Sequence, residues 1–230
     1  NVLAARYYAA GRDREMSETV HTSIMLALIS GVVMAFVGVF FAKGALELMD
    51  TPADVIDQSA LYMRIYFMGM PFFMLYNYGA AILRAVGDTK RPLYFLIVSG
   101  VINAGLNMFL VIVFSLGVAG VAIPSLISRA VAGFILYHLL KNPSNEVHLL
   151  KERFHIDWPV IHKIFYIGIP SGIENGIFQL GRVIVVSIIA GFGTVQIAAN
   201  GVANSLDSMG CIVGQAMNLA MITVIGRCVG

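Results

Sequence analysis

The sequence predicts an all-α membrane protein, a polytopic bundle of six transmembrane helices, and three observations carry this prediction. Of the 230 residues, 58% are hydrophobic and only 12% are charged, whereas soluble domains average about 25% charged residues. The apolar residues gather in six runs, each long enough for the roughly 20 residues that cross a bilayer. The basic residues gather between alternate runs. So few charges cannot cover a water-soluble globule, which excludes the soluble classes of protein.

The first two spans follow a helix tail and a charged turn in residues 1–19. Residues 20–42 are almost unbroken apolar sequence and predict the first complete crossing. The second span, 61–83, contains Gly69 and Pro71, which favour a kink that membrane helices tolerate.

The next two spans carry polar groups. The third, 93–115, contains Asn103 and Asn107, which lie four residues apart and so share one helical face. The fourth, 120–140, follows a very short turn and contains Arg129. Asparagines inside spans are expected first of all to hydrogen-bond between helices.

The longest polar stretch, 142–159, predicts a linker between two halves of the protein. The fifth span, 160–190, is longer than a minimal crossing, so its first turns, 160–166, are expected to lie along the membrane interface. The sixth span, 196–226, is also long.

Charge position predicts the topology. Eleven of the 15 Lys and Arg residues lie in or beside alternate loops, whereas the intervening loops contain only Lys43. The eleven are Arg6, Arg12, Arg14, Arg84, Lys90, Arg91, Lys141, Lys151, Arg153, Lys163 and Arg227. Because Lys and Arg favour cytoplasmic loops, both ends of the sequence are expected in the cytoplasm, with the protein in a bacterial plasma (inner) membrane.

A short internal repeat suggests a longer protein. Residues 2–9 can be laid on residues 223–230 with a shift of 221 positions, which matches Arg6 to Arg227. That period covers almost the whole sequence and predicts two such repeats, of the parallel kind found in transporters. The sequence is therefore expected to be an internal piece.

Several motifs resemble those of the multidrug and toxin extrusion (MATE) family. The connection LRAVGDTKRP at 83–92 is similar to the family's LRxxGDTKxP. Residues 116–122 and the helix opening at 168–170 are similar as well, and residues 193–200 and 224–230 resemble the start of the family's second half.

The resemblance implies a twelve-helix, two-lobe antiporter that exports amphipathic or cationic drugs by alternating access, coupled to Na⁺ or H⁺. Residues 1–141 would be part of the N-terminal lobe, as the end of one helix plus four spans. Residues 142–159 would be a cytoplasmic inter-lobe linker, and residues 160–230 the first two helices of the C-terminal lobe. The implied partners are membrane lipid, small amphipathic cations and the missing helices of the same chain, with no nucleic acid.

Candidate functional residues form two polar stripes on the last two spans. On each span they recur at helical steps of three and four, and Glu174 borders the first stripe. They are Glu174, Asn175, Gln179 and Arg182 on the fifth span, and Asn200, Asn204 and Asp207 on the sixth. Two such stripes on adjacent helices predict a shared polar cavity that couples cations or binds substrate.

The two carboxylates have competing interpretations. An ionisable group at this depth costs roughly 2.5–3.5 kcal/mol on insertion scales, so Glu174 and Asp207 need a compensating function or partner. They would exchange protons or attract a cationic drug, and Glu174 is the candidate for a Na⁺ ligand. Alternatively Glu174 pairs with Arg182, Arg129 or Arg64 and only holds helices together. The family pattern often places an acidic residue one turn later, near Phe178, where this chain has none.

Arg84 and Asp88 form a turn-stabilising pair or, alternatively, a latch between conformations. No Cys/His cluster has metal-ligand spacing, and no Walker A pattern occurs, so ATP is not expected to be the energy source. The resemblance implies a transporter rather than an enzyme, with a coupling ion and no cofactor. Two other functions stay open. One is a flippase for lipid-linked sugars or polysaccharides, whose cavity would be more basic. The other is a non-transporting membrane scaffold, against which the polar stripes argue.

Overall fold

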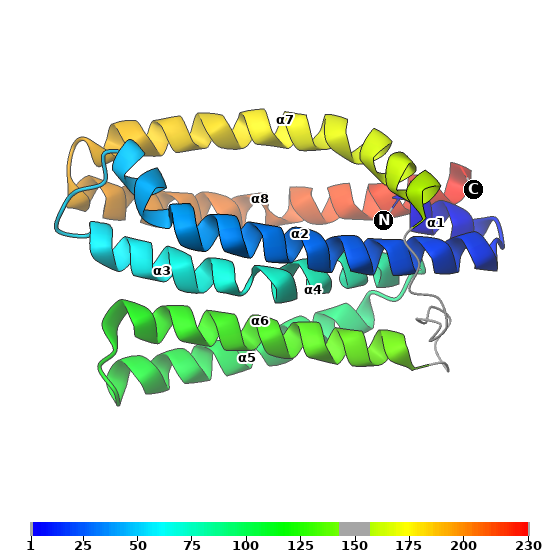
Figure 1. Ribbon diagram of the computed structural model, residues 1–230, viewed down its shortest axis with the longest axis horizontal. Helices are drawn as coiled ribbons and strands as arrows, with labels where there is room; N and C mark the ends of the chain where they lie inside the picture. The colour runs from blue at the N-terminus through cyan, green and yellow to red at the C-terminus, as the bar shows by residue number, and fades with distance from the viewer. Residues whose placement is uncertain (1, 143–156, 230) are drawn as a thin grey trace.

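The computed structural model describes residues 2–142 and 157–229, and all of the secondary structure in these ranges is helical. Figure 1 shows the long helices running side by side along one axis. The helices are α1 Val2–Ala9, α2 Asp13–Leu48, α3 Ile56–Met68, α4 Met70–Ala85, α5 Lys90–Ile112, α6 Gly117–Lys141, α7 Trp158–Ala190 and α8 Thr194–Val229. The predicted all-α helix bundle is confirmed.

Five of the described helices are long and apolar enough to cross a membrane, namely α2, α5, α6, α7 and α8. The second predicted span is instead divided into α3 and α4, of 13 and 16 residues, which meet at Gly69. Pro71 stands in the first turn of α4. Because proline has no N–H and its ring clashes with the carbonyl of the preceding turn, the helix stops and restarts there. The expected kink is therefore a break.

The two ends of the bundle differ in charge. The α2–α3, α5–α6 and α7–α8 connections lie at one end, and the chain termini and the α4–α5 connection lie at the other (Figure 1). The first end carries Asp50, Asp54 and Asp57 and is called the acidic end below; the second carries most of the basic residues and is called the basic end. This alternation of connections is the one that the charge pattern predicts. The predicted linker, 142–159, lies mostly outside the described residues.

The packed core lies in the first part of the chain, residues 2–142. Side chains of α1, α2, α4 and α6 form one buried cluster, in which Val20, Leu136 and Leu140 are fully buried. The backbones of α2 and α4 touch, since a Cβ built on Gly31 would lie 2.5 Å from Pro71 Cα. Close approach through small residues is the usual means of packing membrane helices.

The second part of the chain, residues 157–229, consists of α7 and α8. It packs on the first part through α1–α8 and α2–α7 contacts, and most of its side chains are exposed. In Figure 1 the first turns of α7 slope away from the rest of the helix toward α1. Helix α7 contains Pro170 in its interior, and a proline inside a helix favours a bend because it removes one backbone hydrogen bond.

Candidate functional site

The predicted polar stripes of α7 and α8 meet at one point. Arg182 Nη2 donates a hydrogen bond to Asn204 Oδ1 at 3.1 Å, which joins the two helices. Arg182 and Asn204 also line a pocket of about 480 Å³ between α7 and α8, together with Asn200. Five largely apolar residues complete its wall: Ile177, Phe178, Gly181, Val185 and Val186. We call this the α7–α8 pocket; three of the seven predicted site residues belong to it.

The other four predicted residues do not line this pocket. Asn175 Nδ2 donates to the carbonyl of Ser171 in its own helix, at 2.8 Å. Gln179, Glu174 and Asp207 are exposed, and within the described residues neither carboxylate forms a hydrogen bond or an ion pair. The structure thus brings Asn200 and Asn204 together with the Arg182 guanidinium in one pocket, but leaves both acids and the other two amides outside it.

The ion pairs considered for Glu174 are not present among the described residues. Arg182 binds Asn204, and Arg129 lies over aromatic rings of α3 and α4, with Cζ 4.1 Å from the centroid of Tyr66 and 4.7 Å from that of Phe73. Arg129 Nη1 is buried without a hydrogen-bond partner.

The two carboxylates occupy different depths along the bundle. Because α7 and α8 run antiparallel (Figure 1), Arg182 and Asn204 mark one common level. At a rise of 1.5 Å per residue, Glu174 lies about 12 Å from that level and Asp207 about 4.5 Å, both toward the basic end. The separation of roughly 8 Å makes them two separate candidates rather than one shared ligand pair.

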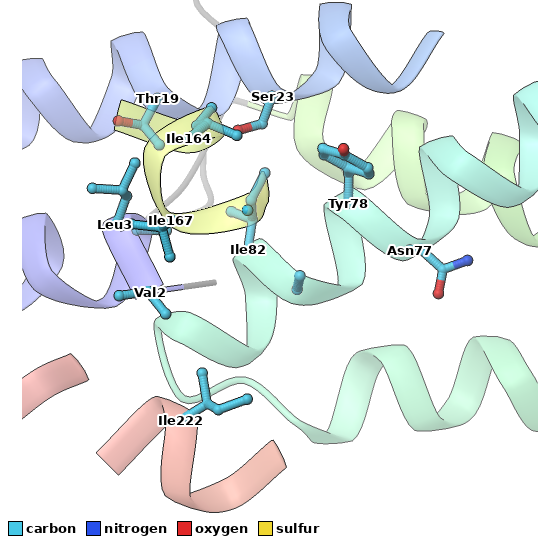
Figure 2. Close-up of a pocket in the computed structure, with 13 residues that line it drawn as sticks. Val2, Leu3, Thr19, Ser23, Asn77, Tyr78, Ile82, Ile164, Ile167 and Ile222 are labelled. Carbon is cyan, nitrogen blue, oxygen red and sulfur yellow. The ribbon is translucent and has the colours of Figure 1, made fainter. Parts of the chain in front are cut away.

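A second pocket lies between the two parts of the chain, and the sequence analysis did not identify it. It has a volume of about 410 Å³, and it is lined by residues of α1, α2, α4, α7 and α8. Figure 2 shows Thr19 and Ser23 of α2, Asn77 and Tyr78 of α4, and apolar residues such as Ile167 of α7 around it. An apolar wall with a few polar groups is typical of small-molecule sites. We call it the inter-part pocket.

A polar network joins α5 to α6. Asn103 Nδ2 donates to Ser125 Oγ and Ser128 Oγ, both at 3.3 Å, and Ser99 Oγ donates to the Ser128 carbonyl at 2.9 Å. Asn107 Nδ2 donates to Asn103 Oδ1 at 2.9 Å, while its own Oδ1 is buried without a partner. Hydrogen bonding between helices, the interpretation favoured for these asparagines, is what the geometry shows for Asn103, whereas Asn107 bonds within α5.

Arg84 and Asp88 do not pair with each other, so the expected turn-stabilising pair is wrong. Asp88 Oδ2 lies 3.2 Å from Arg91 Nε, and Asp88 Oδ1 accepts the backbone N–H of Arg91 at 3.2 Å. The amides at the start of α5 lack helical partners, and this carboxylate satisfies one of them. Arg84 is half-buried, with its Nε unpaired.

Neither a metal cluster nor a disulfide occurs in the described part of the chain. No group of three or more His, Cys, Asp or Glu side chains there is placed to hold a metal ion. Cys211 and Cys228 are free and exposed.

Comparison with known proteins identifies relatives along the whole chain. The MatE family model matches residues 1–109. The chain is 30% identical, over its full length and 51% of the relative's, to the probable multidrug resistance protein YoeA of Bacillus subtilis. It therefore spans about half the length of the curated relatives that it matches.

Solved structures show the same fold. A MOP superfamily transporter from Pyrococcus furiosus superposes with a TM-score of 0.80, at 19% identity over 99% of this chain and 49% of that one. A MATE crystal structure in the bent conformation gives a TM-score of 0.78, also at 19% identity and with the same coverage of both chains. The motifs, the family match and the helix arrangement agree: the chain belongs to the multidrug and toxin extrusion (MATE) family, a family of membrane transporters rather than enzymes.

Proposed function

We propose that this chain is part of a cation-coupled antiporter that exports amphipathic or cationic compounds by alternating access of two helical lobes. Residues 1–141 belong to the N-terminal lobe in this proposal, residues 142–159 form a cytoplasmic linker, and residues 160–230 open the C-terminal lobe. The basic end faces the cytoplasm of a bacterial cell, with the protein in the inner membrane. Its partners in this proposal are the missing helices of the same chain, membrane lipid and the exported cation.

The main support for this proposal is that two helices long enough to span the membrane each contain a carboxylate that forms no ion pair among the described residues. A charge in a span is costly unless it faces a polar cavity or has a function, and Glu174 and Asp207 have no counter-charge among the described residues. Each lies one helical turn from a residue of the α7–α8 pocket, Phe178 and Asn204 respectively. This arrangement supports an acid that binds H⁺ or Na⁺ beside a substrate cavity.

The coupling step needs little chemistry. In this proposal a carboxylate of the spanning helices carries a proton in exchange for the substrate cation. Alternatively its oxygens bind Na⁺, with amide oxygens of the same stripe as further ligands. Either ion competes with a cationic substrate for the same negative charge, and that competition is the basis of exchange.

The inter-part pocket supports alternating access. Its walls come from both parts of the chain, so a relative movement of the two parts changes its size and its access to water. Its mostly apolar lining suits an amphipathic substrate, with Asn77 and Tyr78 as hydrogen-bonding groups. In this proposal substrate passes from here to the α7–α8 pocket during export.

One observation favours the alternative, a flippase for lipid-linked sugars or polysaccharides. Arg182 is the only charged side chain among those that line the α7–α8 pocket, and a guanidinium repels a cationic drug but pairs well with a diphosphate. Export of a cationic dye, measured against movement of a lipid-linked precursor, separates the two functions.

The test is Glu174→Gln in the intact protein, expressed in cells that lack other multidrug exporters. The substitution keeps the shape of the side chain and removes its charge, so drug resistance is expected to fall to the vector-only level with normal expression. The matched control is Glu47→Gln, which removes an exposed carboxylate at the acidic end of α2. Full resistance in Glu174→Gln would refute the role of Glu174; if Asp207→Asn alone abolished resistance, coupling would be assigned to Asp207.

A further inference from the structure

The connection between α4 and α5, part of the LRAVGDTKRP motif, is bound by the last helix of the described chain. Arg227 of α8 donates a hydrogen bond from Nε to the carbonyl oxygen of Ala85, at 3.3 Å. Gly87 has a positive φ of +84°, and a Cβ built there would lie 2.8 Å from Arg227 Nη2. Glycine at this position therefore provides both the turn and the space for the guanidinium.

The same end of α8 packs closely on α1. Gly226 is buried, and a Cβ built on it would lie 3.2 Å from Ala5 Cβ. The guanidinium of Arg227 also faces the ring of Tyr8, with Cζ 5.5 Å from its centroid. One residue earlier in α1, the hydroxyl of Tyr7 accepts a hydrogen bond from Lys163 Nζ of α7 at 2.9 Å.

These contacts join the two parts of the chain at the basic end. The hydrogen bonds from Lys163 and from Arg227 each join residues that are 142 or more positions apart in the sequence. They connect α1 and the α4–α5 connection on one side to α7 and α8 on the other. At the acidic end the parts are linked by the longer hydrogen bond from Ser187 Oγ to the Met49 carbonyl, at 3.4 Å. Between the ends, α7 and α8 are largely exposed.

The partners of Arg227 suit a contact that breaks and re-forms. They are a backbone carbonyl and an aromatic ring, both uncharged, and among the described residues Arg227 has no ion pair with a carboxylate. Arg227 is itself exposed to solvent, so water replaces its partners at little cost when the helices separate. A buried ion pair would hold the parts together more permanently, because breaking it strands a charge.

We propose that Arg227 is a reversible latch: it holds α8 against α1 and the α4–α5 connection, and so closes the basic end between the two parts. This inference rests on the proposed function, because a latch has a role only if the two parts move relative to each other. It gives the LRAVGDTKRP connection a specific task, which is to present the Ala85 carbonyl and the space above Gly87 to the guanidinium. Lys163 and Tyr7 hold the other side of α1 in place.

The first experiment measures opening without any transport assay. Ala5 is fully buried beneath Gly226, so Ala5→Cys in a Cys211→Ser/Cys228→Ser background reacts with a maleimide only when α8 leaves α1. Removal of the latch by Arg227→Ala is expected to raise the labelling rate about threefold to tenfold, the range for losing one hydrogen bond between membrane helices. Arg14→Ala is the matched control, because it removes a basic residue at the same end whose ion pair, among the described residues, is the local one with Glu18.

A second variant distinguishes loss of the latch from misfolding of the protein. Arg227→Lys keeps the charge but loses the planar guanidinium, so its labelling rate is expected between those of the parent and Arg227→Ala, with an unchanged gel-filtration profile. An unchanged labelling rate in both variants would overturn the latch. So would an equal increase in Arg14→Ala, since the effect would then follow from charge alone.

The second experiment uses a disulfide bond to hold α8 against α1. The built Cβ of Gly226 lies close to the Cβ–Cβ spacing of a disulfide, about 3.5–4.5 Å, so Ala5→Cys/Gly226→Cys is expected to cross-link on oxidation. Transport by the intact protein is expected to stop when the bond forms and to return on reduction. Continued transport by fully cross-linked protein refutes the latch. If no variant transports any substrate while Arg227→Ala still speeds labelling, the proposed function fails and the contact at Arg227 stands.

Discussion

Replacing Gly31 by alanine tests whether the backbone contact between α2 and α4 organises the first part of the chain. The new Cβ would lie 2.5 Å from Pro71 Cα, 3.1 Å from Pro71 N and 3.2 Å from the Met70 carbonyl oxygen. Carbon atoms rest about 3.5–4.0 Å apart, so the helices must separate by roughly 1 Å. The three atoms nearest to the new Cβ all belong to the backbone, so no side-chain rotation removes these contacts.

The matched control is Gly44→Ala on the same helix, where a Cβ meets nothing within 4 Å. Both substitutions gain the same helix propensity, about 1 kcal/mol, so their difference isolates the clash. Overpacking costs about 1–3 kcal/mol. Gly31→Ala should therefore melt about 2–12 °C below Gly44→Ala.

The assay is thermal unfolding of the purified protein in detergent, followed by gel filtration of the heated samples. Equal melting temperatures for the two variants, or a higher one for Gly31→Ala, would show that α2 and α4 do not approach each other as described.

Three further predictions use the same unfolding assay, and a fourth uses thiol labelling. Arg129→Lys keeps the charge but loses the flat contact with two aromatic rings, and is expected to cost about 1 kcal/mol; an unchanged melting temperature would contradict that contact. Asn103→Leu removes two hydrogen bonds between α5 and α6 and is expected to cost about 0.6–1.7 kcal/mol, and a stabilised variant would contradict it. Lys43→Ala breaks an exposed ion pair with Asp57 and is expected to change stability by less than about 1 kcal/mol; a larger loss would show that the pair is stronger than its exposure indicates. Asp207→Cys is expected to react with a membrane-impermeant maleimide, which requires a water-filled path to α8, and complete protection would favour a scaffold without transport.

The helices could be predicted from sequence because membrane spans follow from composition alone. Long apolar runs, polar connections and the alternation of basic residues each act locally, and the structure places the connections at the expected ends. The Gly69–Pro71 region was also recognisable, since both residues disfavour a continuous helix. The close approach of Pro71 to Gly31 of α2 joins residues far apart in the sequence, and no local pattern contains that information.

The candidate site was predictable only in part. Helical spacing identified the two stripes, and Arg182 does meet Asn204. The spacing says nothing about how far each helix is rotated or shifted along its axis, so it could not show that Glu174 and Asp207 lie at different depths. The inter-part pocket was missed because its walls come from five helices. The polar residues Thr19 and Ser23, at the start of an apolar run, were the available signal.

The contacts of Asp88 and Arg227 could not be predicted from the local sequence. Asp88 was expected to pair with Arg84, but the unsatisfied amides at the start of α5 and the Arg91 side chain compete for the same carboxylate. Arg227 contacts a connection 142 residues away, and nothing in the local sequence points to it.

Ion-driven export by the purified intact protein is the most direct test of cation-coupled antiport. Reconstituted in liposomes, the protein is given a fluorescent amphipathic cation on one side and an inward gradient of Na⁺ or H⁺ on the other. Dye is expected to move against its own gradient with at least one of the two ions, to stop when the ion gradient is collapsed, and to fail with Glu174→Gln. Dye movement that is indifferent to both ion gradients, or that continues unchanged in Glu174→Gln/Asp207→Asn, would contradict it.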